Sequence, residues 1–570
     1  MCGIAGILGT NLKNGSTIQL MLEAQKHRGP DAMHFWNGGK VVLGHNRLSI
    51  LDLSEAANQP MTSHCGNYVI VFNGEIYNYV ELKKELASYS FSTTSDTEVL
   101  LAAYMHWDAK MLDKLNGMFS FAIWNKKEHT FFAARDRFGV KPFYYTFFEN
   151  QFYFSSEIKA LFAAGIPKSK NQKVWANYFT FGTYGLPNET FFEGVQQLKA
   201  GHFVKINFSD HGDFNRVQPQ MWYDFPERIL KMKQLPKEVL KQQYEELLED
   251  AIQLRFRADV PLGMNVSGGL DSSTLINVVQ RKLPSQKNME AFTFYCNNAT
   301  YDELPWVNEL MRTTSYSLHK VLLEYKEIPA LIEKVSYYQE EPFGGFPTLA
   351  YSLLFQAASQ KGIKVILDGQ GMDEAWAGYD YYHNKSNSVI QGVASSPVRP
   401  EVLVSEFRDL AMEEVYERPF DNDLQNLQYR DLFYTKIPRA LRFNDRISMM
   451  HSTELREPFL DYRLVELAFA QKEEMKFKNG QTKWLLRDLV KDYLGDTVAL
   501  APKRALQTPQ REWIAQELKP YFSEKIAQFS KMDFVDKKQV DAIWNDYLNG
   551  NQDNSFYLWQ WVNFSTLSEF

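Results

Sequence analysis

The chain begins Met1-Cys2-Gly3-Ile4-Ala5-Gly6-Ile7. The small side chain of Cys2 should permit removal of the initiator methionine, which would leave one residue with both a thiol and a free α-amine. Such an amine titrates near ~7.7–8.0 and can take the thiol proton without help from a histidine. Taken alone, the residue could also be an incidental cysteine in a disordered start. The stretch therefore predicts an N-terminal nucleophile only if later motifs supply the rest of a site.

Short apolar segments follow, separated by glycine and asparagine, to about residue 205. Their period of two indicates strands, and they alternate with helical patterns over residues 16–27, 78–88 and 96–107. We predict an α+β fold in which stacked antiparallel sheets pack against helices. The clearest strands are expected at residues 40–44, 68–72, 119–124, 130–134 and 143–146.

Three polar motifs in this region could complete a site for a thiol nucleophile. A thiolate that attacks an amide creates an oxyanion, which fixed N–H donors must stabilise. Asn73-Gly74-Glu75 follows an apolar strand, where an amide and a glycine N–H could serve, although a hairpin turn is the usual structure for Asn-Gly. Asp96 could simply cap a helix, and Arg47 could be a surface residue of a strand. Each motif alone has a structural explanation.

Taken in order, these motifs resemble one family, the glutaminase domain of class II amidotransferases. That family has the N-terminal-nucleophile hydrolase fold, with stacked sheets between helix layers. The resemblance implies that Cys2 is the nucleophile, that its amine is the base, and that Asn73 and Gly74 form the oxyanion hole. The motifs that carry it are residues 1–6, 27–31, 46–48, 72–78, 95–98 and 134–142.

The same resemblance implies a binding site for glutamine. Arg47 would hold the substrate carboxylate, and Glu75 and Asp96 would bind its α-amino group, so each charge meets its opposite. Asn73 and Gly74 would also contact glutamine. The products would be glutamate and ammonia.

The pattern changes after residue 205. Residues 206–238 lose periodicity, turn polar and contain three prolines, so we predict an interdomain linker there. The linker would separate a first domain, residues 1–205, from a second, residues 239–570. A long amphipathic helix is expected at the start of the second domain.

Residues 261–273 place a Gly-rich turn between a buried-type strand and a helix. This layout cradles phosphate with backbone N–H groups and a helix dipole, although the lysine of a Walker A motif is absent. The turn resembles the pyrophosphate loop of ATP pyrophosphatases, which split ATP into AMP and pyrophosphate. The resemblance implies an α/β domain whose site lies at the carboxyl ends of parallel strands. The residues expected to bind ATP are Val266, Ser267, Gly268, Gly269, Leu270, Asp271, Ser272 and Ser273.

A second loop, within residues 365–374, repeats this pattern of an apolar strand, glycine turns and acids. Asp368 and Gly369 are expected to contact ATP. Asp271 and Asp373 would supply oxygen ligands to Mg²⁺ on the phosphates, because Mg²⁺ favours one or two carboxylates plus phosphate. The alternative is a solvated acidic turn.

The remaining motifs complete a resemblance to glutamine-dependent asparagine synthetases, weakest over residues 380–430 and after about 520. It implies that residues 239–570 join ammonia to an aspartyl-adenylate made from aspartate and ATP. It also implies that Lys483 stabilises phosphate charge, although an exposed helix lysine is the structural alternative. Ammonia would need a sequestered interdomain channel. The motifs are residues 341–343, 442–449, 454–461 and 483–487.

The second loop departs from the family pattern Ser-Gly-Asp/Glu-Gly-x-Asp-Glu. Asp368 replaces the serine, and Gln370 replaces the acid that the resemblance implicates in acyl-adenylate formation and in removing a proton from ammonia. Glutamine cannot act as that base. Either Asp368 or Glu374 takes the role, or the acceptor is another carboxylate, such as a sugar uronic acid in surface-polysaccharide assembly. Residues 502–509 also lack a Gly-Phe pair common in the family.

Composition limits the remaining function classes. The 570 residues carry a net charge of −7 without a dense basic block, so neither nucleic acid nor a membrane surface is an expected partner. No long apolar run or signal-peptide pattern is present, and three scattered cysteines suit neither disulfides nor a metal cluster, so we expect a cytoplasmic protein. Its partners would be small-molecule substrates. Oligomeric state stays open, with a homodimer as one alternative.

A regulatory protein that senses glutamine or ATP without turnover is the alternative from a different class. Loss of Cys2, Asp271 or Lys483 would favour that function, and all three are present.

Overall fold

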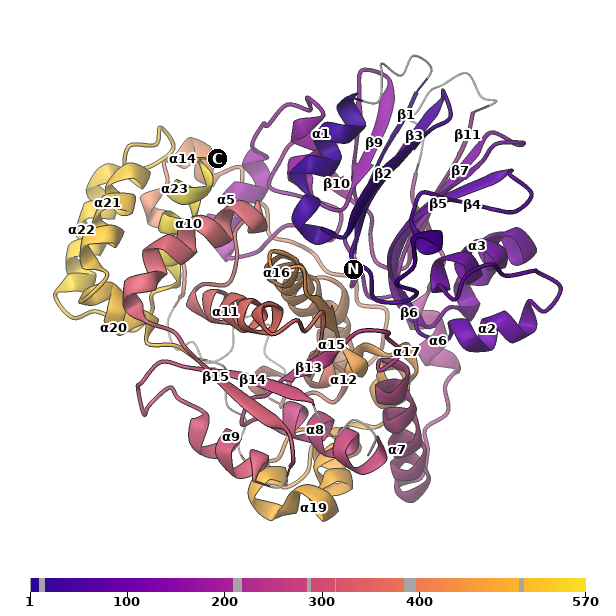
Figure 1. Ribbon diagram of the computed structural model, residues 1–570. Helices are drawn as coiled ribbons and strands as arrows, with labels where there is room; N and C mark the ends of the chain where they lie inside the picture. Colours follow the sequence, from indigo (N-terminus) through magenta and orange to yellow (C-terminus); the bar gives the residue numbers. More distant parts are fainter. Residues whose placement is uncertain are drawn as a thin grey trace.

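The computed structural model describes residues 2–9, 16–208, 218–283, 289–312, 314–383, 396–501 and 507–569. Met1, part of the predicted linker (209–217) and part of the stretch that lacks Gly-Phe (502–506) lie outside these ranges. The described residues form three sheets, two of six strands and one of five (Figure 1). No helix in these ranges is long and apolar enough to cross a membrane.

The first half of the chain contains two antiparallel sheets. The first has the order β10-β8-β9-β1-β3-β2, and the second β12-β11-β7-β6-β5-β4. The strands of the first sheet are β1 (Gly3–Leu8), β2 (Ala32–Asn37), β3 (Val41–Arg47), β8 (Tyr144–Phe148), β9 (Gln151–Ser155) and β10 (Gln196–Gln197). Those of the second are β4 (Met61–Thr62), β5 (Tyr68–Ile76), β6 (Gly117–Asn125), β7 (Thr130–Arg135), β11 (His202–Asn207) and β12 (Gln220–Met221).

Alternating side chains place these sheets face to face with helices outside. Ile4 of β1 packs with Val69 of β5 between the sheets, whereas the next residue, Ala5, packs with Ile18 of the outer helix layer. Because successive strand residues point to opposite faces, both faces of each sheet are buried. The predicted stacked sheets between helix layers are therefore present (Figure 1). The outer helices are α1 (Ser16–Ala24), α2 (Tyr79–Glu85), α3 (Asp96–Trp107) and α4 (Ile158–Ala163).

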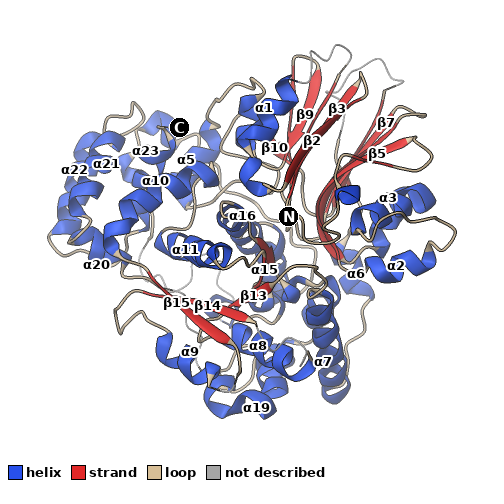
Figure 2. Cartoon of the chain, in the orientation of Figure 1, coloured by secondary structure: helices blue, strands red, loops and turns tan. Residues whose placement is uncertain are grey.

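The second half contains the predicted parallel sheet, in the order β15-β14-β13-β16-β17. Helices lie on both of its sides (Figure 2). The strand order reverses between β13 and β16. In α/β sheets, ligands bind at the carboxyl ends of the strands on either side of such a reversal. The strands are β13 (Leu262–Asn265), β14 (Glu290–Tyr295), β15 (Ser317–Leu322), β16 (Val365–Leu367) and β17 (Glu454–Arg456).

The other helices mostly surround this sheet or extend to the carboxyl terminus. They are α5 (Gln172–Phe181), α6 (Phe225–Lys231), α7 (Lys237–Leu254), α8 (Leu270–Lys282), α9 (Leu304–Met311), α10 (Ile328–Gln339), α11 (Phe346–Gln360), α12 (Met372–Ala375), α13 (Asp380–His383), α14 (Ser405–Arg408), α15 (Asp423–Phe433), α16 (Lys436–Met449), α17 (Tyr462–Phe469), α18 (Glu473–Lys476), α19 (Trp484–Ala499), α20 (Gln510–Ala515), α21 (Lys519–Phe529), α22 (Lys537–Leu548) and α23 (Phe556–Leu567).

The described part of the predicted linker contains regular structure. β12 pairs with β11 and extends the second sheet, and α6 buries Phe225 and Ile229 in the core of the second half. Pro226 stands in the first turn of α6, behind the N-cap Asp224. A proline there starts a helix rather than breaking one. Both elements are too short for a periodic pattern to reveal.

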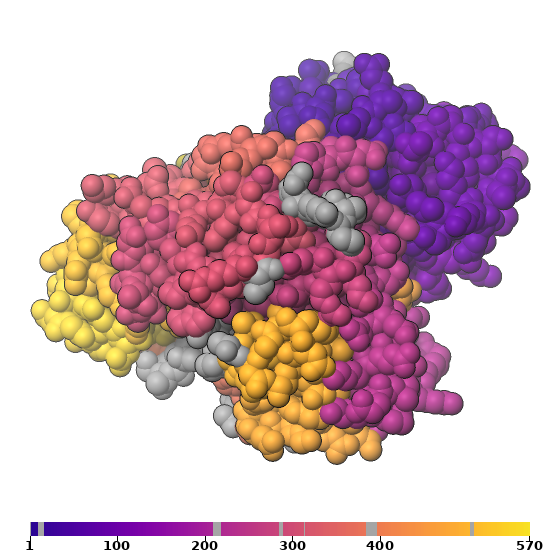
Figure 3. Space-filling view, turned by 60° about the horizontal axis from the view of Figure 1, so that its bottom comes forward, coloured from indigo at the N-terminus to yellow at the C-terminus, as the bar shows by residue number. Residues whose placement is uncertain are grey.

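The N-terminal part forms a lobe against the rest of the molecule (Figure 3), and buried ion pairs cross the junction. The Arg28 guanidinium lies 3.0 Å from Glu157 of its own half and 2.8 Å from Asp445 of α16. Arg446, the next residue of α16, contacts Glu157 at 3.3 Å. Removing one member of such a buried pair costs about 3–5 kcal/mol, because its partner stays charged and unpaired. α16 thus fixes one half against the other.

Candidate active sites

A cavity of about 350 Å³ lies beside the start of β1, β5 and the amino end of α3. Asn73 is not among the residues that line this cavity. It lies in β5 beside Gly74, and its side chain contacts the backbone nitrogen of Cys2. The structure thus brings the residues of the predicted glutamine site together. Those that line the cavity are Cys2, Arg47, Gly74, Glu75 and Asp96.

Cys2 is buried immediately before β1. Its backbone nitrogen donates to Asn73 Oδ1 at 2.9 Å, and Arg28 Nε donates to its carbonyl oxygen at 3.1 Å. Burial raises the pKa of the Cys2 thiol, and the nearby Arg47 guanidinium opposes that effect. A base must therefore remove the thiol proton before this residue can act as a nucleophile.

Asn73 and Gly74 lie inside β5, which runs two residues beyond Gly74, rather than in a turn after the strand. The pairing of β5 with β6 continues through both residues. A Cβ at Gly74 would lie 2.1 Å from the Met118 carbonyl oxygen, so only glycine fits this close approach. Asn73 Nδ2 is buried and has no hydrogen-bond acceptor among the described residues. A free amide N–H beside a thiol is what an oxyanion requires.

Arg47 ends β3 and is buried, not a surface strand residue. Its Nη1 donates to the Ser54 carbonyl and to Asn58 Oδ1, each at 2.7 Å, and its Nη2 donates to the Asp52 carbonyl. These neutral acceptors fix the guanidinium without neutralising it. Its positive charge therefore remains available to a carboxylate in the cavity.

Acidic side chains form the opposite end of the cavity. Burial raises the pKa of Asp96 to about 6 and that of Glu75 well above its ordinary value. Asp96 Oδ2 also accepts a hydrogen bond from the Ile76 N–H at 2.8 Å. A ligand ammonium would stabilise both carboxylates, as the sequence predicts for the α-amino group of glutamine.

The sequence did not reveal that the second half contributes to this site. Arg456 of β17 reaches Glu75 Oε1 at 3.4 Å and donates to Glu454 at 2.6 Å. Glu454 is itself among the groups that raise the pKa of Glu75. The sequence shows only two charged residues, Glu454 and Arg456, on either side of a leucine, and this pattern does not identify a partner hundreds of residues away.

The first ATP loop joins β13 to α8. Ser272 Oγ accepts from the Ser267 N–H at 3.2 Å and donates to the Ser267 carbonyl at 2.8 Å, which closes the turn tightly. A Cβ at Gly268 would lie 2.7 Å from that of Trp306. Val266 precedes the turn, Gly269 is the N-cap of α8, and Leu270 to Ser273 form its first residues. The predicted strand, turn and helix are therefore in place.

Lys483 connects this loop to the second one. Its Nζ lies 2.7 Å from both Asp271 oxygens and 2.7 Å from Asp373 Oδ1. Burial would lower the pKa of Lys483, but the two carboxylates raise it, so the side chain is a cation. Lys483 is buried and has a φ of 54°, a left-handed conformation that is strained for a side chain of this kind. Lys483 is therefore not an exposed lysine on a helix, which was the alternative to a role at the phosphates.

Asp368 and Gly369 place the second loop against the first. A Cβ at Gly369 would lie 3.2 Å from that of Asp271. Asp368 Oδ1 accepts the Gly369 N–H at 2.7 Å, and burial raises the pKa of Asp368 to about 6. Gln370 follows and is half-buried. Glu374 is turned toward Tyr379, whose hydroxyl donates to it at 2.6 Å.

The donor set fits the expected magnesium ion. Asp271 and Asp373 each have an oxygen 2.7 Å from the same Lys483 nitrogen, so both carboxylates face a single point. Mg²⁺ is bound in nucleotide sites by one or two carboxylates together with phosphate oxygens. These two residues therefore suit such an ion once phosphates are present.

A second cavity, of about 340 Å³, lies beside the first ATP loop. It includes the predicted residues Val266 and Ser267. Sequence patterns did not single out its other walls, among them Phe294 at the end of β14 and Tyr351 on α11. Aromatic walls beside a phosphate loop suit a nucleoside.

Two family models match the chain, a glutamine amidotransferase domain over residues 1–216 and asparagine synthase over residues 243–569. Glutamine-hydrolyzing asparagine synthetase 1 of Bacillus subtilis is 28% identical over 98% of this chain and 95% of its own length. Putative asparagine synthetase 2 of Methanocaldococcus jannaschii is 34% identical over 66% of this chain and 76% of its own. Amidase chry2 of Gibberella zeae is 28% identical over 94% and 93%. The chain therefore belongs to the asparagine synthase family and is a glutamine-hydrolysing, ATP-dependent ligase.

Proposed function

We propose that this ligase is an asparagine synthetase that takes nitrogen from glutamine at Cys2 and transfers it to an aspartyl-adenylate at the ATP loops. One observation carries the proposal: the three-residue strand β17 contacts both sites. The Arg456 side chain reaches Glu75 in the glutamine cavity, while its carbonyl accepts the N–H of Asp368 at 3.0 Å. The two reactions would thus occur in a glutaminase domain, residues 1–205, and a synthetase domain, residues 239–570, on either side of this strand.

At the first site the Cys2 amine, free once Met1 is removed, takes the thiol proton. The thiolate attacks the amide carbon of glutamine, and Asn73 Nδ2 and the Gly74 N–H stabilise the oxyanion. Arg47 holds the α-carboxylate, and Glu75 and Asp96 hold the α-ammonium. The tetrahedral intermediate releases ammonia, and water then hydrolyses the thioester to glutamate. The unpartnered Asn73 amide supports this assignment most directly.

At the second site residues 266–273 and Asp368-Gly369 hold ATP. The acceptor carboxylate attacks the α-phosphorus, and pyrophosphate leaves. Lys483 stabilises the phosphate charge by its position between Asp271 and Asp373. Those two carboxylates would hold Mg²⁺, which supplies further neutralisation of phosphate charge when bound. Ammonia then attacks the acyl-adenylate and displaces AMP.

We assign to Asp368 the proton transfer that Gln370 cannot perform. Asp368 lies at the junction of the two ATP loops, and its pKa of about 6 leaves it a base at neutral pH. Both carboxylates accept hydrogen bonds, Glu374 from the Tyr379 hydroxyl and Asp368 from Asn265 at the end of β13, so the position of Asp368 beside the first ATP loop carries the assignment. Asp368, a buried acid at the position where the family has serine, therefore supports amide synthesis by this chain even though Gln370 is not an acid.

The second candidate function uses the same chemistry on another carboxylate, such as a sugar uronic acid. Asp368 and Gln370 favour it because they alter the loop that the family resemblance ties to acyl-adenylate formation. The relatives include a protein named as an amidase as well as named asparagine synthetases, so their names do not decide the acceptor.

Pyrophosphate release across a panel of carboxylic acids, with glutamine, ATP and Mg²⁺ present, separates the two functions. Asparagine synthesis predicts release with aspartate and an asparagine product identified by mass spectrometry. Release with a uronic acid but not with aspartate would replace the first function with the second.

A further inference from the structure

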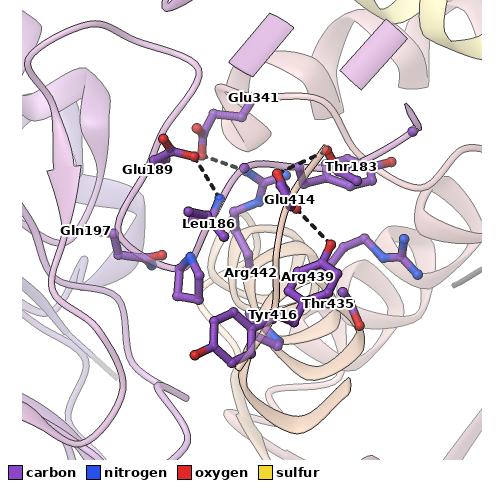
Figure 4. A pocket seen from close by; sticks show the side chains of 16 residues that line it. Thr183, Leu186, Glu189, Gln197, Glu341, Glu414, Tyr416, Thr435, Arg439 and Arg442 are labelled. Atoms are coloured by element: carbon purple, nitrogen blue, oxygen red, sulfur yellow. Dashed lines mark hydrogen bonds and ion pairs between the residues drawn. The ribbon is translucent and has the colours of Figure 1, made fainter. Parts of the chain in front are cut away.

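Figure 4 shows a third cavity, which shares no lining residue with the glutamine cavity or with the cavity beside the first ATP loop. Its walls come from the segment after α5, from Glu341 just beyond α10 and from the start of α16, together with Glu414 and Tyr416. None of the residues assigned above to glutamine, ATP or Mg²⁺ lines it. The two proposed reactions therefore do not account for this cavity.

One wall carries an acid that lacks a cationic partner. Glu414 accepts hydrogen bonds from the Thr183 hydroxyl at 3.1 Å and the Tyr416 hydroxyl at 2.8 Å (Figure 4). No lysine or arginine of the described ranges forms an ion pair with it. Burial raises the pKa of Glu414, so a ligand cation beside it would be stabilising.

The opposite charge is present on α16. Arg442 donates to Glu341 at 2.8 Å and to the Pro342 carbonyl at 2.6 Å, but its Nε is buried with no acceptor in the described structure. Arg439, one turn earlier, forms no ion pair with any described acid. Both guanidinium groups lie over the Tyr184 ring, 5.4 and 5.6 Å from its centre. These unused donors suit a carboxylate.

We propose that this cavity binds a small zwitterion, an α-amino acid. Its ammonium would pair with Glu414, its carboxylate with Arg439 and Arg442 Nε, and its side chain would lie against Leu186 and Tyr434 of the wall. A phosphorylated ligand would be repelled by the cavity's acids, and a simple cation by its arginines. Only a ligand with both charges meets both sets of groups.

Calorimetric titration of the full chain with the twenty L-amino acids tests the proposal. At least one should bind, and its N-acetyl and carboxamide derivatives should not, because each lacks one charge. Glu414→Gln and Arg439→Gln should each weaken binding by about tenfold or more, since a hydrogen bond to a charged group is lost. The matched controls Glu413→Gln and Arg418→Gln, at exposed residues outside the cavity, should change it by less than about twofold.

Retained glutaminase activity and an unchanged melting temperature would show that the variants fold. The proposal is overturned if no amino acid binds, or if the blocked derivatives bind as well as the parent. It is also overturned if binding survives both cavity substitutions. Binding that is abolished by Asp96→Asn or Asp271→Asn but not by Glu414→Gln would place the amino acid in one of the two sites already described.

Discussion

At the scale of single residues, chemistry at the first site depends on a thiol whose surroundings do not ionise it. Burial raises the pKa of the Cys2 thiol, and the Asn73 side chain accepts a hydrogen bond from the Cys2 backbone nitrogen. The α-amine produced by loss of Met1 would lie where the Cys2 nitrogen now meets Asn73 Oδ1. In the proposed mechanism the nucleophile and its base therefore belong to one residue, and the charged side chains of the cavity bind the charged ends of glutamine.

Cys2→Ala should abolish glutamine hydrolysis but leave synthesis from added ammonium within about twofold of wild type, because the ATP site is separate. Glutamate release and pyrophosphate release, measured on the same samples, check both halves of this expectation. Mass spectrometry of the active wild-type chain should show that Met1 is absent. Equal loss of both activities would contradict two separate sites.

The role proposed for Asp368 predicts a pH dependence for the ammonium-driven reaction. Its pKa is raised to about 6, so the residue is a base above that pH and becomes protonated below it. The rate, corrected for the concentration of free ammonia, should therefore fall about tenfold for each pH unit below 6. Asp368→Asn should lower the rate at neutral pH by about 100-fold or more. A profile flat through pH 6 would remove Asp368 from the mechanism.

At the scale of elements, sequence patterns located the strands and loops but not the long-range contacts. β5 and the loop before α8 follow from apolar runs and glycine positions within a few residues. The extension of β5 through Asn73 depends on pairing with Ser120 of β6, which is distant in the sequence. The left-handed, buried Lys483 and the contact of Arg456 with Glu75 depend on still more distant partners. Local patterns cannot encode these contacts.

Strand β17 should couple the two reactions. Arg456→Lys keeps the charge but loses the guanidinium fork that contacts Glu454 and Glu75. We expect more glutamate per amide product than in wild type, because glutamine hydrolysis would continue while less ammonia would reach the ATP site. The ratio of the two products, measured by chromatography, checks this. Arg463→Lys, on the nearby helix α17, is a control, and a ratio equal to wild type in Arg456→Lys would exclude the coupling role.

At the scale of the whole molecule, buried ion pairs join the two halves of the chain. Arg28 is fully buried between Glu157 and Asp445, and Arg446 extends the network. The sequence identified both motifs separately, as parts of two domains. It could not show that they pair, because nothing local to either motif specifies the other.

Arg28→Met should leave two buried acids without this partner and destabilise the protein by about 3–5 kcal/mol. Lys26→Met, which removes only an exposed pair with Glu23, should cost less than about 1 kcal/mol. Melting temperatures of the two variants and the wild type give the comparison. Equal melting temperatures for all three would contradict the role of the buried network.

The central claim is that nitrogen released at Cys2 reaches the ATP site without entering solvent. Amide-labelled ¹⁵N-glutamine, supplied with ATP, excess unlabelled ammonium and the carboxylic acid that supports pyrophosphate release, tests it in one mass spectrum of the product. We predict that the new amide carries ¹⁵N in large excess over its share of the total ammonia. A product whose nitrogen matches the unlabelled pool would contradict the account.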